Sequence, residues 1–156
     1  MVKILADTSV LVAALAASHV HHARARPWLK AAEEKRFDLG LSVHALAETY
    51  SVLTRIPYPA KFSAVKAKKA LEEIAGITIV IDADAALYVA TLDRCVSLGL
   101  ILGAVFDGLH IVSAERWGAG AVLTFNEADF VRLSLPTSPK VIVPPDPPAV
   151  TVGRPR

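Results

Sequence analysis

The chain has 156 residues, of which 53% are hydrophobic, so it has the size of one domain and can bury its own core. Its one cysteine, Cys95, excludes a disulfide framework within the chain and fits a cytoplasmic setting, in agreement with the lack of a signal-peptide pattern at the start. The net charge of +2 gives no argument for nucleic-acid binding, and the longest apolar run, residues 95–106, is too short for the roughly 20 residues that cross a membrane.

Apolar runs and stretches of helical periodicity alternate along the chain. In chain order, the expected elements are a strand at 2–6, helices at 10–17 and 23–36, a strand at 37–41, helices at 43–55 and 62–75, a strand at 77–81, helices at 83–98 and 107–117, a strand at 121–124, a helix at 127–133 and a weak strand at 140–143. Continuous apolar strands that alternate with helices are typical of a parallel sheet covered on both faces. The sequence therefore predicts an α/β fold, a three-layer α/β/α sandwich with a central parallel sheet of four to five strands.

Capping residues support several of these boundaries. The expected N-caps are Thr8 or Ser9, Ser42, Asp82 and Asp107, and the expected stops are Gly76, Gly99 and the segment 118–120. The sequence contains no repeat and no internal boundary, so residues 1–143 are expected to form a single domain. Residues 144–156 are rich in proline and are expected to form a flexible tail.

Acidic residues stand beside elements that are expected to be buried. Asp7 follows the first strand, Glu48 lies in the helix at 43–55, and Asp107 follows a long apolar run. A fourth, Asp129, comes just after the fourth strand. Because ligands of open parallel sheets bind beyond the carboxyl ends of the strands, Asp7 and Asp129 would converge if the first and fourth strands are neighbours.

Carboxylates grouped in this way predict a site for a hard divalent cation. Three or four of them within about 5 Å repel one another by roughly 3 kcal/mol per pair at an effective dielectric near 20. Without a cation, one of them should titrate well above its ordinary value. Mg²⁺ or Mn²⁺ would remove this penalty, and either ion can orient a phosphodiester and activate a water.

Four segments resemble, in order, the motifs of PIN-domain nucleases. Residues 4–11 (ILADTSVL) resemble the first motif, and residues 42–48 (SVHALAE) resemble the second, a helix that carries a glutamate. Residues 106–114 (FDGLHIVSA) are similar to the third motif, and residues 118–130, with GAG followed by LTFNEADF, are similar to the fourth. The compact size most resembles the VapC-type toxins of toxin–antitoxin pairs.

The resemblance implies a Mg²⁺- or Mn²⁺-dependent endoribonuclease that hydrolyses RNA, a cognate antitoxin protein that masks the site, and a homodimer. Carried over by position, Asp7 and Asp107 are the strongest metal ligands, and Glu48 completes the acidic set. In the fourth motif, either Asn126 or Asp129 faces the metal. Polar side chains that would hold the carboxylates in place are Thr8, Ser9 and Thr124.

Two other functions stay open on the sequence alone. Asp7 at a strand end could accept a phosphoryl group, although the haloacid-dehalogenase-type signature needs a second Asp two residues later, where Ser9 stands. The chain could also be a non-catalytic PIN-like interaction module, although all four acidic positions are filled. His110 lies one helical turn from Asp107, and we expect it to be a structural histidine rather than a contact to substrate.

Overall fold

The computed structural model describes residues 1–145, so the tail expected at 144–156 falls almost wholly outside the described residues. The strands are β1 (Lys3–Ala6), β2 (Asp38–Ser42), β3 (Ile79–Ile81), β4 (Ala121–Leu123) and β5 (Lys140–Ile142). The helices are α1 (Thr8–Leu15), α2 (His22–Glu33), α3 (Val43–Arg55), α4 (Ala64–Ile77), α5 (Ala85–Ser97), α6 (Ala104–Trp117) and α7 (Glu127–Leu133). All strand pairs are parallel, in the order β3-β2-β1-β4-β5, which confirms the predicted α/β fold.

Side chains of β1 alternate between two separate core clusters. Ile4 and Ala6 pack into one cluster with α1 and α2, whereas Leu5 packs into the other with α5, α6 and α7. This alternation is the two-residue period of a strand, and it requires both faces of the sheet to be covered. Leu5 and Ala6 are accordingly shielded completely from solvent.

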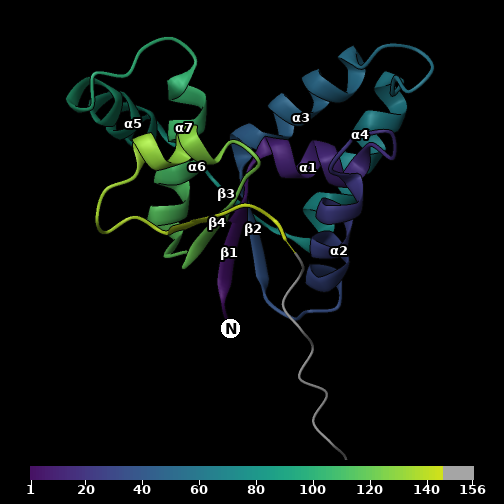
Figure 1. Cartoon of the computed structure of the whole chain (residues 1–156), viewed down its shortest axis with the longest axis horizontal. Coiled ribbons are helices and arrows are strands. Elements are labelled where there is room, and N and C mark those ends of the chain that lie inside the picture. Colours follow the sequence, from purple (N-terminus) through teal and green to yellow (C-terminus); the bar gives the residue numbers. More distant parts are fainter. Residues whose placement is uncertain (146–156) are drawn as a thin grey trace, which may run out of the picture.

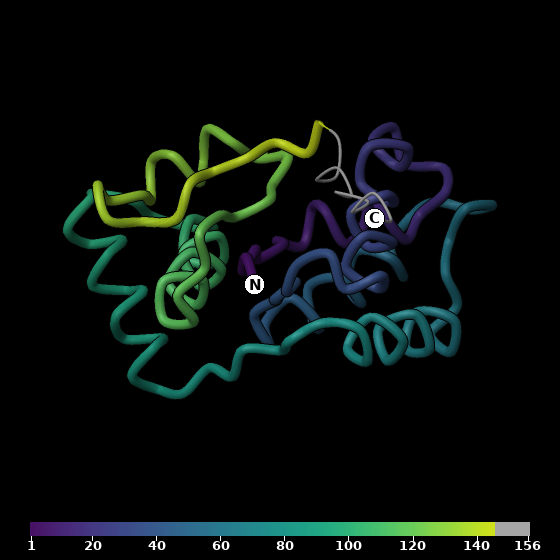
Figure 2. The backbone as a smooth tube through the Cα atoms, turned by 90° about the horizontal axis from the view of Figure 1, so that it is seen from below, coloured from purple at the N-terminus to yellow at the C-terminus, as the bar shows by residue number. Residues whose placement is uncertain are grey.

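The helices form a layer on each face of the sheet. Figure 1 shows α1, α2 and α4 on one side of β1 and α5, α6 and α7 on the other. Figure 2, turned by 90°, also places α2 (blue) and α6 (green) on opposite sides of the N-terminal strand. A third core cluster, in which Val12, Leu53 and Phe62 pack together, joins α1, α3 and the start of α4. Within residues 1–145, none of the helices has the length and apolarity that crossing a membrane requires.

Element boundaries lie within three residues of those predicted, but the N-caps of α1 and α5 differ. Helix α1 is capped by Asp7, whose Oδ1 accepts an N–H of the first turn at 3.1 Å, so the predicted caps Thr8 and Ser9 lie inside the helix. Helix α5 is capped by Asp84 rather than Asp82, because the chain stays extended for two residues more than predicted.

Asp107 was predicted to begin a helix and Gly76 to end one, but each residue lies inside a helix. Helix α6 begins at Ala104, because the preceding loop turns sharply at Leu102, where φ is 57°. Asp107 is therefore in the first turn, where the positive end of the helix dipole favours a carboxylate. Helix α4 continues one residue past Gly76, since the buried side chain of Ile74 anchors its last turn in the core.

Candidate active site

β1 is the central strand of the sheet, and the order of the strands changes direction there. Strands β2 and β3 extend it on one side, and β4 and β5 extend it on the other, so β1 and β4 lie next to each other with Ala6 paired to Leu123. Such a switch point is where open α/β sheets bind ligands. Asp7 leaves β1 at this point and Thr124 leaves β4, so the two segments converge, as the sequence predicted for the case that the first and fourth strands are neighbours.

Asp7 is only 1% exposed, and both of its carboxylate oxygens accept hydrogen bonds. Oδ1 accepts from the Ser9 hydroxyl at 2.6 Å and from the Val10 N–H at 3.1 Å, and Oδ2 accepts from the Thr124 hydroxyl at 2.6 Å. Burial raises the pKa of Asp7, although nearby His110 and the hydrogen bonds act in the opposite direction. The carboxylate is thus fixed in one orientation at the end of the central strand.

The same two hydroxyls also fix the loop that follows β4. The Ser9 hydroxyl accepts the N–H of Phe125 at 3.0 Å, and the Thr124 hydroxyl accepts the N–H of Asn126 at 2.9 Å. The first and fourth motifs are therefore joined through Asp7, so a change at either hydroxyl would disturb both.

Glu48 of α3 is held by a histidine of α6. His110 is 1% exposed, with its Nε2 2.9 Å from Glu48 Oε1 and its Nδ1 2.9 Å from Ser42 Oγ. A carboxylate can only accept, so Nε2 donates to Glu48, and in the neutral ring the Ser42 hydroxyl donates to Nδ1. Burial acts to raise the pKa of Glu48, but the hydrogen bond and charge of His110, together with His44 and Thr8, lower it overall.

In the described part of the chain, Asp107 differs from the other acids in having no hydrogen-bond partner for its carboxylate. Its carboxylate accepts no hydrogen bond from any side chain or N–H within residues 1–145. Burial raises its pKa to about 6, with further contributions from the negative charges of Asp7, Asp129 and Glu48. Asp7, Asp129 and Glu48 therefore all lie close enough to Asp107 to act on its carboxyl group, although the four acids come from four separate segments of the chain.

The two candidates from the fourth motif differ in position. Asn126 is exposed at the start of α7, and Asp129 is half-buried one turn later, with its Oδ1 2.5 Å from a guanidinium nitrogen of Arg132. Because Asp129 contributes to the raised pKa of Asp107, its charge acts on the acidic site. Which of the two would contact a metal stays a prediction.

Two hollows flank the acids. One, of about 330 Å³, lies between α6 and α7 and is lined by Asp107 and Asp129. The other, of about 470 Å³, lies between α3 and the start of α6 and is lined by Glu48. Asp107 and Asp129 are thus reached from one hollow and Glu48 from the other, whereas the buried Asp7 lines neither.

The sequence pattern of the PIN domain matches residues 4–135, which include all four acidic positions. The chain belongs to the PIN-domain family. Ribonuclease VapC40 of Mycobacterium tuberculosis is 34% identical to this PIN domain over 113 residues, which are 72% of this chain and 79% of that protein. The predicted resemblance to VapC-type proteins is therefore confirmed.

Solved structures with the same fold include two from VapC systems. VapC20 of Mycobacterium tuberculosis, described as a Sarcin-Ricin loop cleaving toxin, superposes with a TM-score of 0.63 at 18% identity, covering 87% of this chain and 99% of that one. VapBC2 of Rickettsia felis, bound to a DNA fragment from their promoter, gives a TM-score of 0.63 at 19% identity, covering 90% and 98%. At such low identity, these matches confirm the fold.

The side chains of this PIN domain fit a hard divalent cation by type and charge. The donors are carboxylate oxygens, and the raised pKa values of Asp7 and Asp107 reflect burial and, at Asp107, neighbouring negative charges, both of which a bound cation would offset. Within residues 1–145, however, no group of three or more acidic, histidine or cysteine side chains lies close enough together to hold a metal ion. The fit is therefore one of ligand chemistry and charge.

Sequence reasoning missed the two histidines that contact Glu48. His110 is buried, as expected of a structural histidine, but its ring also reaches across to Glu48. His44 Nε2 lies 3.3 Å from Glu48 Oε1, and its ring stacks on Phe106 with centroids 5.5 Å apart. Helical spacing could have identified His44, which lies four residues before Glu48, whereas the contact of His110 with Glu48 depends on how α6 lies against α3.

Proposed function

We propose that this PIN domain is a divalent-metal-dependent endoribonuclease and the toxin of a cytoplasmic type II toxin–antitoxin pair. The observation that carries the proposal is the gathering of Asp7, Glu48, Asp107 and Asp129 at the switch point of the sheet, where burial and the charges of the other three acids raise the pKa of Asp107. Mutually repelling carboxylates at a ligand-binding edge destabilise the fold unless a cation offsets their charge.

Each acid has a distinct role in this proposal. Asp7, fixed by two hydroxyls, and Asp107, which has a free carboxylate, would hold the ion, and Glu48 would complete the set in the orientation that His110 imposes. When bound, Mg²⁺ or Mn²⁺ would supply a Lewis acid and an activated water for attack on a phosphodiester. Asn126 or Asp129, at the start of α7, would contribute a further oxygen ligand.

The substrate assignment to RNA follows the relatives. VapC40 is named a ribonuclease, and VapC20 is described as a toxin that cleaves the Sarcin-Ricin loop. The two hollows beside the acids leave room for a strand on either side of the cleaved bond. We expect hydrolysis to leave a 5′-phosphate and a 3′-hydroxyl, as the family resemblance implies.

The partner assignments also follow the relatives. VapBC2 is a VapC-system structure determined on promoter DNA. We propose that this chain has a cognate antitoxin that covers the acidic site, and that it forms a homodimer. Co-expression with the neighbouring small open reading frame, followed by co-purification, tests the first, and light scattering tests the second.

A quenched fluorescent RNA tests the activity directly. We expect cleavage with Mg²⁺ or Mn²⁺, loss of cleavage in EDTA, and a fall of about 100-fold or more in Asp7→Asn. Asp93→Asn is the matched control, because Asp93 is an exposed aspartate on α5 away from the switch point. Equal loss in both variants, or cleavage that EDTA leaves intact, would contradict the proposal.

The same assay separates the two alternatives. A stable phosphoryl adduct on Asp7 would indicate phosphoryl transfer instead of hydrolysis. Absence of both cleavage and adduct over a range of RNAs would indicate a non-catalytic interaction module.

A further inference from the structure

Phe106 is an exposed aromatic ring at the edge of the acidic site. It directly precedes Asp107 in the first turn of α6, and it is 48% exposed although it ends the longest apolar run of the chain. One part of the ring is covered by His44 of α3, with the two ring planes 2° apart and the centroids 5.5 Å apart. The rest of the ring faces solvent, which is unfavourable for an aromatic side chain that has no further partner.

The hollow beside this ring leads from the acids along α3. It has a volume of about 470 Å³, and its lining includes His44, Phe106, Glu48 and Arg55. His44, Glu48 and Arg55 occupy one face of α3, since separations of four and eleven residues fall close to whole helical turns. This hollow is therefore bordered by the carboxylate of Glu48, the stacked rings of His44 and Phe106, and the guanidinium of Arg55.

Arg55 supplies the positive charge of this surface. It is exposed in the last turn of α3, and it makes no ion pair or hydrogen bond with any residue in the described part of the chain. It lies seven residues beyond Glu48, which corresponds to a rise of about 10 Å along the helix. A guanidinium at that distance is too far from the acids to balance their charge directly, and it is free to contact a phosphate of a strand that passes along α3.

We propose that Phe106, backed by His44, is a stacking site for an unpaired base next to the cleaved phosphodiester, and that Arg55 binds a phosphate further along the same strand. The proposal rests on the ribonuclease function proposed above, and it specifies the substrate as RNA that is single-stranded where it enters this hollow. A base in a rigid duplex could not leave its neighbours to stack on the ring, whereas unpaired bases stack readily on aromatic side chains.

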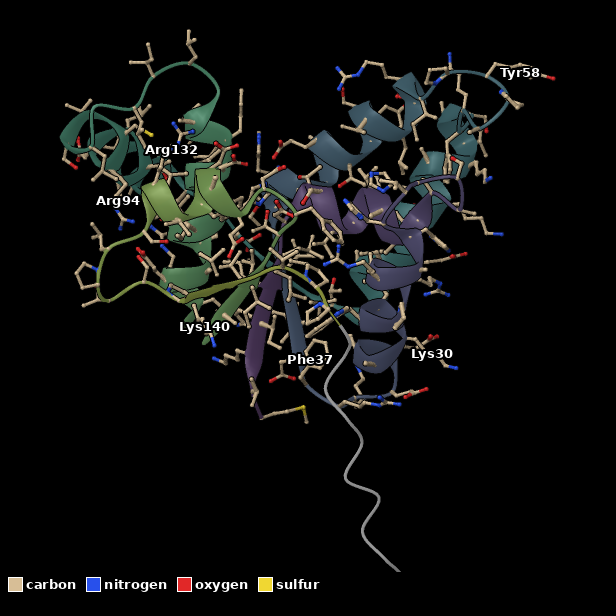
Figure 3. All side chains as sticks on the ribbon, viewed as in Figure 1. Lys30, Phe37, Tyr58, Arg94, Arg132 and Lys140 are labelled. Carbon is tan, nitrogen blue, oxygen red and sulfur yellow. The ribbon has the colours of Figure 1, made fainter. Side chains whose placement is uncertain are left out.

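Steady-state cleavage of a short unstructured RNA tests the stacking site. Phe106→Leu keeps the apolar volume and removes the ring, and we expect KM to rise between about fivefold and a hundredfold with a smaller change in kcat. Phe106→Trp keeps a stacking surface and should restore KM to within a few-fold of wild type. Tyr58→Leu is the control, because Tyr58 is 90% exposed at the tip of the loop between α3 and α4, far from α6 (Figure 3).

A substrate series locates the stacked base. One base at a time is replaced by an abasic nucleotide, and we expect a single position beside the cleaved bond to reproduce the KM of Phe106→Leu in the wild-type protein. The same abasic RNA should cause no further loss in Phe106→Leu, because the two changes remove one interaction. Full additivity of the two changes would overturn the stacking site.

Arg55 has its own readout in the salt dependence of binding. With Asp7→Asn as the non-cleaving background, Arg55→Ala should lower the slope of log Kd against log salt by about 0.7, the value for one phosphate contact to a single strand. Lys30→Ala, an exposed cation on α2 (Figure 3), should leave the slope unchanged. An unchanged slope in Arg55→Ala would remove this residue from the proposal.

These measurements separate the subsite from the activity on which it rests. Cleavage that does not depend on Phe106 would overturn the stacking site and leave the ribonuclease intact. Binding that depends on Phe106 without any cleavage would support the site and overturn the enzyme. A Phe106→Leu protein with unaltered KM and a changed oligomeric state by light scattering would assign this ring to a protein interface and overturn the proposal.

Discussion

Replacing Asp107 with asparagine should stabilise the metal-free protein while it abolishes the proposed activity. Asparagine has nearly the same shape and no charge, so it removes both the cost of burying a charged carboxylate, which is the main cause of the raised pKa of Asp107, and the repulsion from Asp7, Asp129 and Glu48. The pKa of the Asp107 carboxyl group is higher in the folded chain than in the unfolded chain. The group therefore adds to the free energy of unfolding, and this contribution is complete at any pH below the pKa of the unfolded chain. The contribution is lost as the pH rises through the pKa of the folded chain.

The size of the effect follows from the two pKa values. The pKa of Asp107 rises from 3.8 to about 6 on folding, and a shift of that size corresponds to about 3 kcal/mol. Because the carboxyl group stays partly in contact with water, we expect only about 1–2 kcal/mol. The wild-type protein should therefore lose about 1–2 kcal/mol of unfolding free energy, relative to Asp107→Asn, as the pH rises from below 4 to above 6.

Urea unfolding in EDTA, repeated from pH 4 to pH 8, measures this difference. The two proteins should have similar free energies of unfolding near pH 4 and diverge above pH 6, with the variant more stable. Addition of Mn²⁺ at pH 7.5 should reverse the order, because an ion that binds only the folded wild type stabilises it by mass action. A stability difference that does not vary with pH would refute the electrostatic reasoning.

Five further substitutions test the hydrogen bonds, ion pairs and packing of the fold. His110→Ala removes a buried ring that is hydrogen-bonded at both nitrogens, and should lower the free energy of unfolding by about 2–4 kcal/mol in urea. Arg94→Ala breaks a largely buried ion pair and should lower it by about 2–3 kcal/mol, whereas Arg116→Ala, which breaks an exposed pair with Asp84, should change it much less. Gly40→Ala should lower the melting temperature, since its new Cβ would lie 2.5 Å from a tryptophan ring atom, and Gly76→Ala should raise it, since open space surrounds a helical glycine there.

Much of the fold could be predicted because the pattern of each element is local. The strands at 2–6 and 121–124 are short apolar runs that are each followed by a helix, which is enough to indicate a parallel sheet. Their adjacency is not local, because it depends on the order in which strands join the sheet. The convergence of Asp7 with the fourth motif therefore stayed conditional until the order β3-β2-β1-β4-β5 was known.

The surroundings of the acids could be predicted only in part. Ser9 and Thr124 were expected to hold carboxylates, and both donate to Asp7. Thr8 was expected to do the same, and its hydroxyl both lies 3.4 Å from a ring nitrogen of His110 and helps to lower the pKa of Glu48 through a hydrogen bond. Phe106 belongs to an apolar run and would be assigned to the core by composition, yet the loop before α6 turns it outward. Side-chain direction at a helix start depends on where the helix begins, which sequence signals locate least well.

Four consecutive residues of α6 show how tightly site and packing are combined. Asp107 and His110 are three residues apart and so share the face that meets Glu48. Gly108, between them, faces α5, where a Cβ would come within 2.8 Å of a methyl group of Thr91. A side chain at position 108 would push α6 away from α5 and shift both polar residues relative to Glu48. The glycine therefore lets α6 pack closely enough to bring an acid and a histidine to the same edge of the sheet.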